Sequence, residues 1–167
     1  MNYLIQPKQI TFDLDLSSEL GRGSRYLKFE GQGEIEKYVD KGLELGNRLV
    51  ESKAIYSIGR NSDELIDEYH LPGPLEDAEL LAFGISTIGM DLERKVDELM
   101  EEGDYALSNI LDSVGSAAVN ETADRLGQKV LTYSRENNLQ NTRAFSPGSG
   151  SSHWDIKNQQ LIFDSLR

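Results

Sequence analysis

The order of hydrophobic and polar residues predicts a chain of alternating strands and helices. Apolar residues at every second position from Gln9 to Leu16 predict a half-buried strand, because successive side chains of a strand point to opposite faces. Short β-rich runs predict two more strands, at residues 54–58 and 79–87, and the second run is apolar enough for the centre of a sheet. Apolar residues three and four positions apart predict helices, which we expect at residues 34–52, 63–70, 91–100, 104–136 and 155–166.

The remaining segments predict loops and complete the fold class. Residues 17–33 are rich in glycine and polar residues, with room for one short strand at residues 25–29, and a Pro/Gly cluster at residues 71–74 ends the helix before it. Helices interleaved with about three strands predict an α+β fold. Within the longest predicted helix, Gly115 costs about 1 kcal/mol relative to alanine, so we expect a neighbouring element to pack closely against it.

Composition and charge narrow the range of partners. The 167 residues fit a single domain spanning residues 1–167, and 29 acidic against 17 basic residues give a net charge of -12. Because such a surface repels phosphate groups, we expect neither a nucleic-acid nor a membrane partner. The absence of cysteine excludes disulfides, thiolate metal sites and cysteine nucleophiles. The N-terminal residues lack the pattern of a secretory signal, and no apolar run approaches the roughly 18–20 residues of a membrane span, so we expect a cytoplasmic protein.

The sequence contains no catalytic or metal-binding motif that we recognise. The two histidines, His70 and His153, lie far apart and outside any spacing typical of metal ligands. Because His153 stands beside Trp154 at a predicted helix start, we interpret it as a capping or packing residue. Acidic pairs such as Glu101 and Glu102 are interpreted as solvated helix surface. No catalytic residue and no metal ligand is therefore predicted.

One loop could hold an anion. Residues 146–152 read Ser-Pro-Gly-Ser-Gly-Ser-Ser and precede a predicted helix, whose N-terminal N–H groups favour a carboxylate or a phosphate. Arg143, just upstream, could pair with the same anion. Composition alone favours an ordinary turn without a ligand over an anion site, and both interpretations stay open.

Three segments in order form a pattern that is more specific than any of them alone. Residues 82–89 read Ala-Phe-Gly-Ile-Ser-Thr-Ile-Gly, and residues 110–126 contain Ile-Leu-Asp-Ser-Val-Gly-Ser-Ala-Ala-Val followed by Ala-Asp-Arg-Leu. Residues 142–148 read Thr-Arg-Ala-Phe-Ser-Pro-Gly and precede a helix with Trp154, Gln160 and Phe163. Together these segments resemble the activation domain family of cobalamin-dependent methionine synthase, with its long helix, its Arg-x-x-Pro-Gly-Tyr loop and its Trp…Gln…Leu-Phe helix.

The resemblance implies both a fold and a function. The fold is an α+β domain in which helices, one of them long and central, flank a twisted antiparallel sheet. In this family of methionine biosynthesis, the domain binds S-adenosylmethionine and presents its methyl group to a corrinoid that has been oxidised to cob(II)alamin. A flavoprotein supplies the electron that accompanies the transfer. Such a domain needs no acid, base or nucleophile, because it contributes binding and orientation.

The resemblance also implies a cofactor site, at which this sequence departs from the family. The residues that it assigns to S-adenosylmethionine are Arg143, Phe145, Ser146, Pro147, Gly148 and Ser149. Arg143 stands one position before the arginine of the family pattern, and Ser149 replaces the family's tyrosine. Family members continue into a Thr-Glu-Ser-x-x-Met segment and a Ser-Val-Ser-Gly hairpin, which nothing in this sequence matches. We therefore expect a shortened, stand-alone relative that lacks this C-terminal segment.

Two hypotheses of function follow. In the first, the protein is a reactivation domain that binds S-adenosylmethionine and serves a corrinoid-dependent methyltransferase. In the second, it is a non-catalytic module that keeps the fold, has lost the cofactor and docks a corrinoid-binding protein, a methyltransferase or a flavoprotein reductant. Pairing of the chain with itself as a homodimer is open under either hypothesis.

Overall fold

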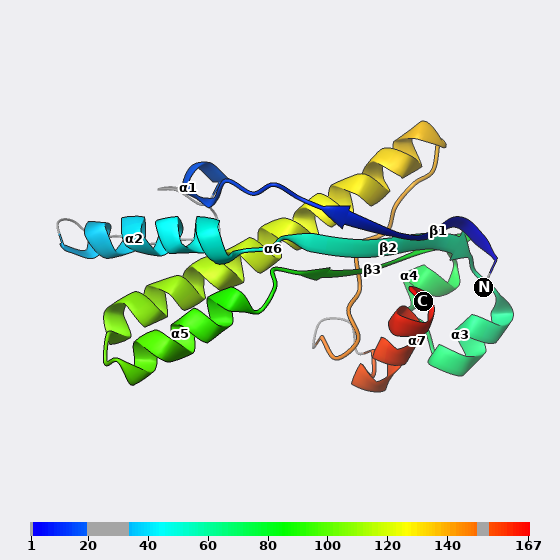
Figure 1. Ribbon diagram of the computed structural model, residues 1–167. Helices are drawn as coiled ribbons and strands as arrows, with labels where there is room; N and C mark the ends of the chain where they lie inside the picture. Colours follow the sequence, from blue (N-terminus) through cyan, green and yellow to red (C-terminus); the bar gives the residue numbers. More distant parts are fainter. Residues whose placement is uncertain (1, 20–33, 150–153) are drawn as a thin grey trace. The chain divides into compact units, whose positions relative to one another are not determined.

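The computed structural model describes residues 2–19, 34–149 and 154–167 (Figure 1). Its strands are β1 (Tyr3–Thr11), β2 (Lys53–Arg60) and β3 (Leu80–Thr87), hydrogen-bonded in the order β1-β2-β3. The amide of Arg60 donates to the carbonyl of Asn2 (3.0 Å), whereas the amide of Phe12 donates to that of Ser52 (2.9 Å). Because the start of one strand meets the end of the other, β1 and β2 are antiparallel.

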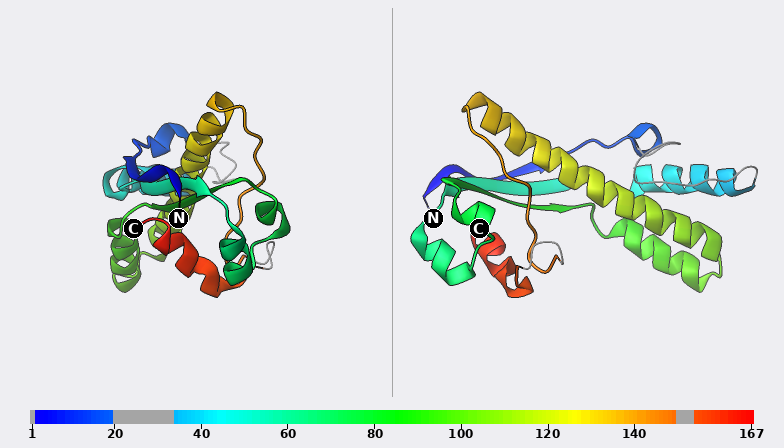
Figure 2. Two further views of the ribbon diagram at one scale, coloured as in Figure 1. Left: turned by 90° about the vertical axis from the view of Figure 1, so that its right-hand side faces the viewer. Right: turned by 180° about the vertical axis from the view of Figure 1, so that it is seen from behind.

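Helices make up most of the remaining described chain (Figures 1 and 2). They are α1 (Leu16–Glu19), α2 (Glu34–Leu49), α3 (Asp63–Tyr69), α4 (Gly73–Glu76), α5 (Asp91–Glu101), α6 (Tyr105–Glu136), the 3₁₀ turn η1 (Ile156–Asn158) and α7 (Gln159–Asp164). The predicted α+β fold with one long helix is confirmed. Helix α6 begins one residue later than the periodicity predicted and ends at the predicted residue.

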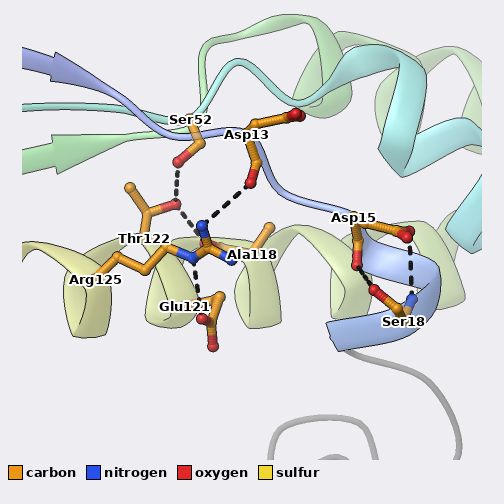
Figure 3. Close-up of polar contacts among 8 residues, drawn as sticks. All are labelled: Asp13, Asp15, Ser18, Ser52, Ala118, Glu121, Thr122 and Arg125. Atoms are coloured by element: carbon orange, nitrogen blue, oxygen red, sulfur yellow. Dashed lines mark hydrogen bonds and ion pairs between the residues drawn. The ribbon is translucent and has the colours of Figure 1, made fainter.

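Two strand predictions were wrong. The first strand ends at Thr11, and Leu16 begins α1 instead of closing the strand. The reason is local, because the Asp15 carboxylate accepts from the amide of Ser17 (3.1 Å), as an N-cap does (Figure 3 shows the neighbouring Asp15–Ser18 contacts). The run at residues 80–87 forms an edge strand, since β2 lies at the centre of the sheet.

Other boundaries also differ from the sequence predictions. The Pro/Gly cluster contains the short helix α4, which proline favours because its fixed φ suits the first turn. The final helix is shorter than predicted and begins with the 3₁₀ turn η1. The short strand predicted at residues 25–29 lies outside the described residues.

The described chain groups into two compact units, and the division falls inside all three strands and inside α6. The first unit comprises residues 2–10, 55–85 and 126–167, and the second comprises residues 11–54 and 86–125. The buried core of the first unit consists of Leu71, Leu81, Phe83, Trp154, Leu161 and Leu166. The second unit has two buried clusters, one with Leu16, Leu43, Ile88, Val114, Ala117 and Ala118, the other with Leu92, Leu99, Leu107 and Leu111.

Close approach at glycines packs the helices of the second unit. A Cβ atom on Gly46 of α2 would lie 2.7 Å from Val114 Cγ1 and 2.9 Å from Leu16 Cδ1. On α6, a Cβ atom on Gly115 would lie 2.6 Å from Leu92 Cδ2 of α5. The close packing expected at Gly115 is therefore confirmed, because neighbouring side chains fill the space that a Cβ atom would need.

Substitution by alanine is expected to change stability in opposite directions at two glycines, one with crowded surroundings and one with open space around it. Gly46→Ala should lower the free energy of unfolding by about 1 kcal/mol or more, since the gain in helix propensity is smaller than the cost of displacing two fully buried side chains. Gly127→Ala should raise it by about 0.5–1 kcal/mol, because nothing lies within 4 Å of the new Cβ atom. Denaturant unfolding followed by circular dichroism measures both. A gain in stability for Gly46→Ala would contradict the close packing.

Candidate functional site

The candidate site is the loop from Arg143 to Ser149 in the first unit. Arg143 is exposed, and its guanidinium carbon lies 4.6 Å from the centre of the Phe145 ring. Phe145 is half-buried and packs against the core cluster that contains Trp154. The cation–π contact therefore restrains the cationic group on a ring that the core itself fixes.

The centre of this loop is a tight turn. The amide of Ser149 donates to the carbonyl of Ser146 at 3.1 Å, which closes a β-turn with Pro147 and Gly148 in the middle. Pro147 is buried, and its ring fixes φ at the second position of the turn. Gly148 has a φ of 79°, in the left-handed region that favours glycine, and a side chain there would meet Ile156. The Pro-Gly pair is thus required by the shape of the backbone.

Trp154 ties this turn to a distant part of the first unit. Its carbonyl accepts from the amide of Gly148 at 2.8 Å, and its indole Nε1–H donates to the carbonyl of Tyr69 at 2.9 Å. The side-chain amide of Asn158 donates to the same Tyr69 carbonyl at 2.8 Å. That carbonyl belongs to the last residue of α3, where the next residue, His70, caps the helix in a left-handed conformation (φ 45°). His70 is exposed, and His153 lies outside the described residues.

The hydrogen bonds of the loop decide which groups could hold the anionic part of a ligand. The amides of Gly148 and Ser149 already donate to carbonyls of the protein, so these N–H groups are not directed at an anion. The N-terminus of η1 is capped by Asp155, whose carboxylate accepts from the amide of Lys157 at 2.9 Å. The guanidinium of Arg143 is cationic and exposed, and guanidinium groups in general pair well with carboxylates. Arg143 is the cationic group among the residues that the sequence suggested for an anion.

A second group of polar residues lies in the second unit, where α6 meets the ends of the strands (Figure 3). Thr122 Oγ1 donates to the carbonyl of Ala118 at 2.7 Å, so the hydroxyl of Ser52, 2.9 Å away, is the donor to Thr122. Both hydroxyls are buried and satisfy each other inside the protein. These bonds fix α6 to the segment before β2 and leave neither hydroxyl directed to solvent.

Arg125 completes this group. Its Nε lies 3.3 Å from Glu121 Oε1, and its Nη1 donates to the carbonyl of Asp13 at 3.2 Å (Figure 3). A guanidinium bridging α6 and the backbone after β1 holds two elements together. We interpret the group as structural, because its contacts either lie within α6 or join α6 to the segments beside the strands, at Ser52 and Asp13.

Among the described residues, pKa values are shifted at three positions: Glu51, Lys95 and the half-buried Tyr69. Lys53, whose Nζ is 2.6 Å from the Glu51 carboxylate, lowers the pKa of Glu51, and Glu98 raises the pKa of Lys95. Desolvation raises the pKa of the Tyr69 phenol. The causes of these shifts involve no contact between any two of the three residues, so the shifts do not mark a common site. Across the described ranges, no cluster of three or more His, Asp or Glu residues could hold a metal ion, and no helix is both long and apolar enough to cross a membrane.

No protein-family model matches the sequence, and no curated protein matches it at a significant level. The resemblance to the activation domain family therefore rests on the residues quoted for it. Of these, the structure joins Gly148, which follows Pro147 in the turn, to Trp154 by a backbone hydrogen bond. The sequence analysis missed the role of Asn158 and of the Tyr69 carbonyl, because no local pattern links residues about 90 positions apart.

Proposed function

We propose that this protein is a domain of a corrinoid-dependent methyl-transfer system, similar to the reactivation domain of cobalamin-dependent methionine synthase. The observation that carries the proposal is that two parts of the motif meet in the structure: the amide of Gly148, in the Pro147-Gly148 turn, donates to the carbonyl of Trp154 at 2.8 Å. A cytoplasmic location and a role in methionine biosynthesis are parts of the same proposal.

In this proposal the protein binds and orients S-adenosylmethionine. The sulfonium group supplies the methyl group, and a corrinoid protein and a flavoprotein reductant are the partners. Arg143 holds the carboxylate of the ligand, and Phe145 keeps the guanidinium in place. Pro147 and Gly148 give the turn its shape, with the hydroxyl-bearing residues Ser146 and Ser149 at its two ends.

Removal of the Arg143 charge is the direct test. Arg143→Ala should weaken the binding of S-adenosylmethionine and S-adenosylhomocysteine by about 1–3 kcal/mol, because a charge-assisted hydrogen bond is lost. Isothermal titration calorimetry of the purified protein measures both affinities. Arg135→Ala, which removes the same charge from an exposed position on α6, is the matched control and should leave them unchanged. Equal affinities in the Arg143 variant and the unaltered protein would remove Arg143 from the site.

A second candidate function is a non-catalytic docking module that has lost the cofactor. Two observations favour it: the loop amides of Gly148 and Ser149 are already bonded within the protein, and the net charge is -12. In this case a corrinoid-binding protein or a methyltransferase associates with the acidic surface, and electrostatic attraction raises the association rate. Salt-sensitive association with a corrinoid protein, together with no heat of binding for either nucleoside ligand, would favour this function over the first. Sedimentation velocity of the chain by itself tests the homodimer.

A further inference from the structure

The outward side of α5 carries a row of four residues that the proposed site does not use. Figures 1 and 2 show α5 beside the first half of α6, and Leu92 and Leu99 pack there against Leu107 and Leu111. Residues three and four positions apart share one side of a helix. On the exposed side of α5, four residues follow one another at intervals of three, four and three positions and so lie in one row: Met90, Glu93, Asp97 and Met100. We call these four residues the α5 row.

The two methionines of the α5 row are unusually exposed for apolar side chains. Met90 is 59% exposed and Met100 is 47% exposed, at the two ends of the helix. The two methionines are separate apolar contact points, about 15 Å apart along the helix with Glu93 and Asp97 between them, and a partner of similar length could cover both. Flexible thioether side chains also adapt to different packing partners, which is why methionine is frequent on binding surfaces.

The two carboxylates of the α5 row define the charge of such a partner. Both basic residues of α5 are already paired, Arg94 with Asp91 (3.0 Å) and Lys95 with Glu98 (2.9 Å). Glu93 and Asp97 form no ion pair with any part of the chain that the structure describes. From residue 91 to residue 104 the sequence has seven carboxylates and two basic residues. A complementary surface is therefore cationic, and nucleic acids and anionic lipids are repelled.

We infer that the α5 row is the docking site for a basic amphipathic helix of a partner protein. Lysine or arginine side chains of that helix pair with Glu93 and Asp97, while its apolar side chains cover Met90 and Met100. A helix suits the row because its own side chains recur at the same spacing of three and four. The inference does not depend on the binding of S-adenosylmethionine, so the two can fail separately.

A peptide-binding experiment tests the docking site. The probe is a fluorescein-labelled peptide of leucine and lysine in amphipathic helical order, and fluorescence anisotropy at low and high salt gives its affinity for the full chain. Glu93→Gln combined with Asp97→Asn should weaken binding by about fivefold or more at low salt, because two ion pairs are lost. Met90→Ala combined with Met100→Ala should weaken it to a similar extent, by loss of apolar contact.

The control has the same change of charge in the first unit. Glu64→Gln combined with Asp67→Asn removes one Glu and one Asp from the exposed surface of α3, and binding should change by less than about twofold. Circular dichroism verifies that each variant keeps its helices. If the α5 variant and the α3 control weakened peptide binding equally, the inference would be overturned, because the net charge of the protein would then explain binding. It would also be overturned by unchanged binding in the methionine variant, or by no binding of the peptide to the unaltered protein.

Discussion

Replacement of Trp154 by alanine is expected to lower the free energy of unfolding by about 3–5 kcal/mol, the range typical of a large buried aromatic side chain. Trp154 is 5% exposed and belongs to the core cluster of the first unit, with Leu161 and Phe83. Its loss would leave a cavity and remove the indole hydrogen bond to Tyr69. Urea unfolding followed by circular dichroism measures the change in the free energy of unfolding. Tryptophan fluorescence cannot be used for this variant, because Trp154 is the only tryptophan of the chain.

Two further variants separate the contributions to this effect. Trp154→Phe should cost less than the alanine variant because it keeps much of the apolar volume, whereas both variants lose the indole hydrogen bond and keep the bond from Asn158 to the Tyr69 carbonyl. Phe163→Ala, at a residue 50% exposed, should change stability by less than about 1 kcal/mol. A loss for Trp154→Ala as small as that for Phe163→Ala would contradict the position of Trp154 in the core.

The Trp154 variants also bear on the candidate site. The Trp154 side chain is part of the core cluster on which Phe145 packs, and it anchors the backbone carbonyl that accepts from the Gly148 amide. Any affinity for S-adenosylmethionine that depends on this loop should therefore fall in Trp154→Ala, although Trp154 need not touch the ligand. In that sense Trp154 is a positioning residue.

Replacement of Leu111 by alanine should lower the free energy of unfolding by about 2–5 kcal/mol. The Leu111 side chain is fully buried, and its cluster joins α5 to α6 through Leu92, Leu99 and Leu107. The cost is the lost burial together with a cavity that helices fixed by close glycine contacts cannot readily fill. Thermal or urea unfolding measures the change.

Val119→Ala is the matched control on the same helix. Val119 is 41% exposed, so its truncation removes little buried area, and alanine is the better helix former. We expect a change within about 0.5 kcal/mol. If both substitutions had equally small effects, the cluster around Leu111 would not be a stabilising core.

The elements that the sequence predicted well are those defined by local pattern. Helix α6 and helix α5 follow from apolar residues three and four apart, a periodicity that the chain carries in consecutive turns. Strand β2 follows from a short β-rich run ended by polar residues. The strand at residues 9–16 was misplaced, because alternation of apolar residues continues past Thr11 into a turn capped by Asp15.

The candidate site was predicted in part. The sequence pointed to the loop around Pro147 and Gly148, since Pro-Gly pairs mark turns and this one precedes a helix. It did not indicate that the Gly148 amide is bonded to Trp154, or that Trp154 reaches the end of α3. Those bonds connect residues that have no local pattern in common, and they determine which N–H groups the loop can offer to an anion.

The sequence by itself therefore determined the longer helices, the net charge, the absence of thiol chemistry and the position of the loop, because each depends on neighbouring residues or on composition. Only the tertiary structure decided that β3 is an edge strand, that Gly46 of α2 has no room for a side chain, and which loop amides are already bonded. These properties depend on contacts between residues distant in the chain. Such contacts are selected by the packing of the whole fold and leave no periodic signal in the sequence.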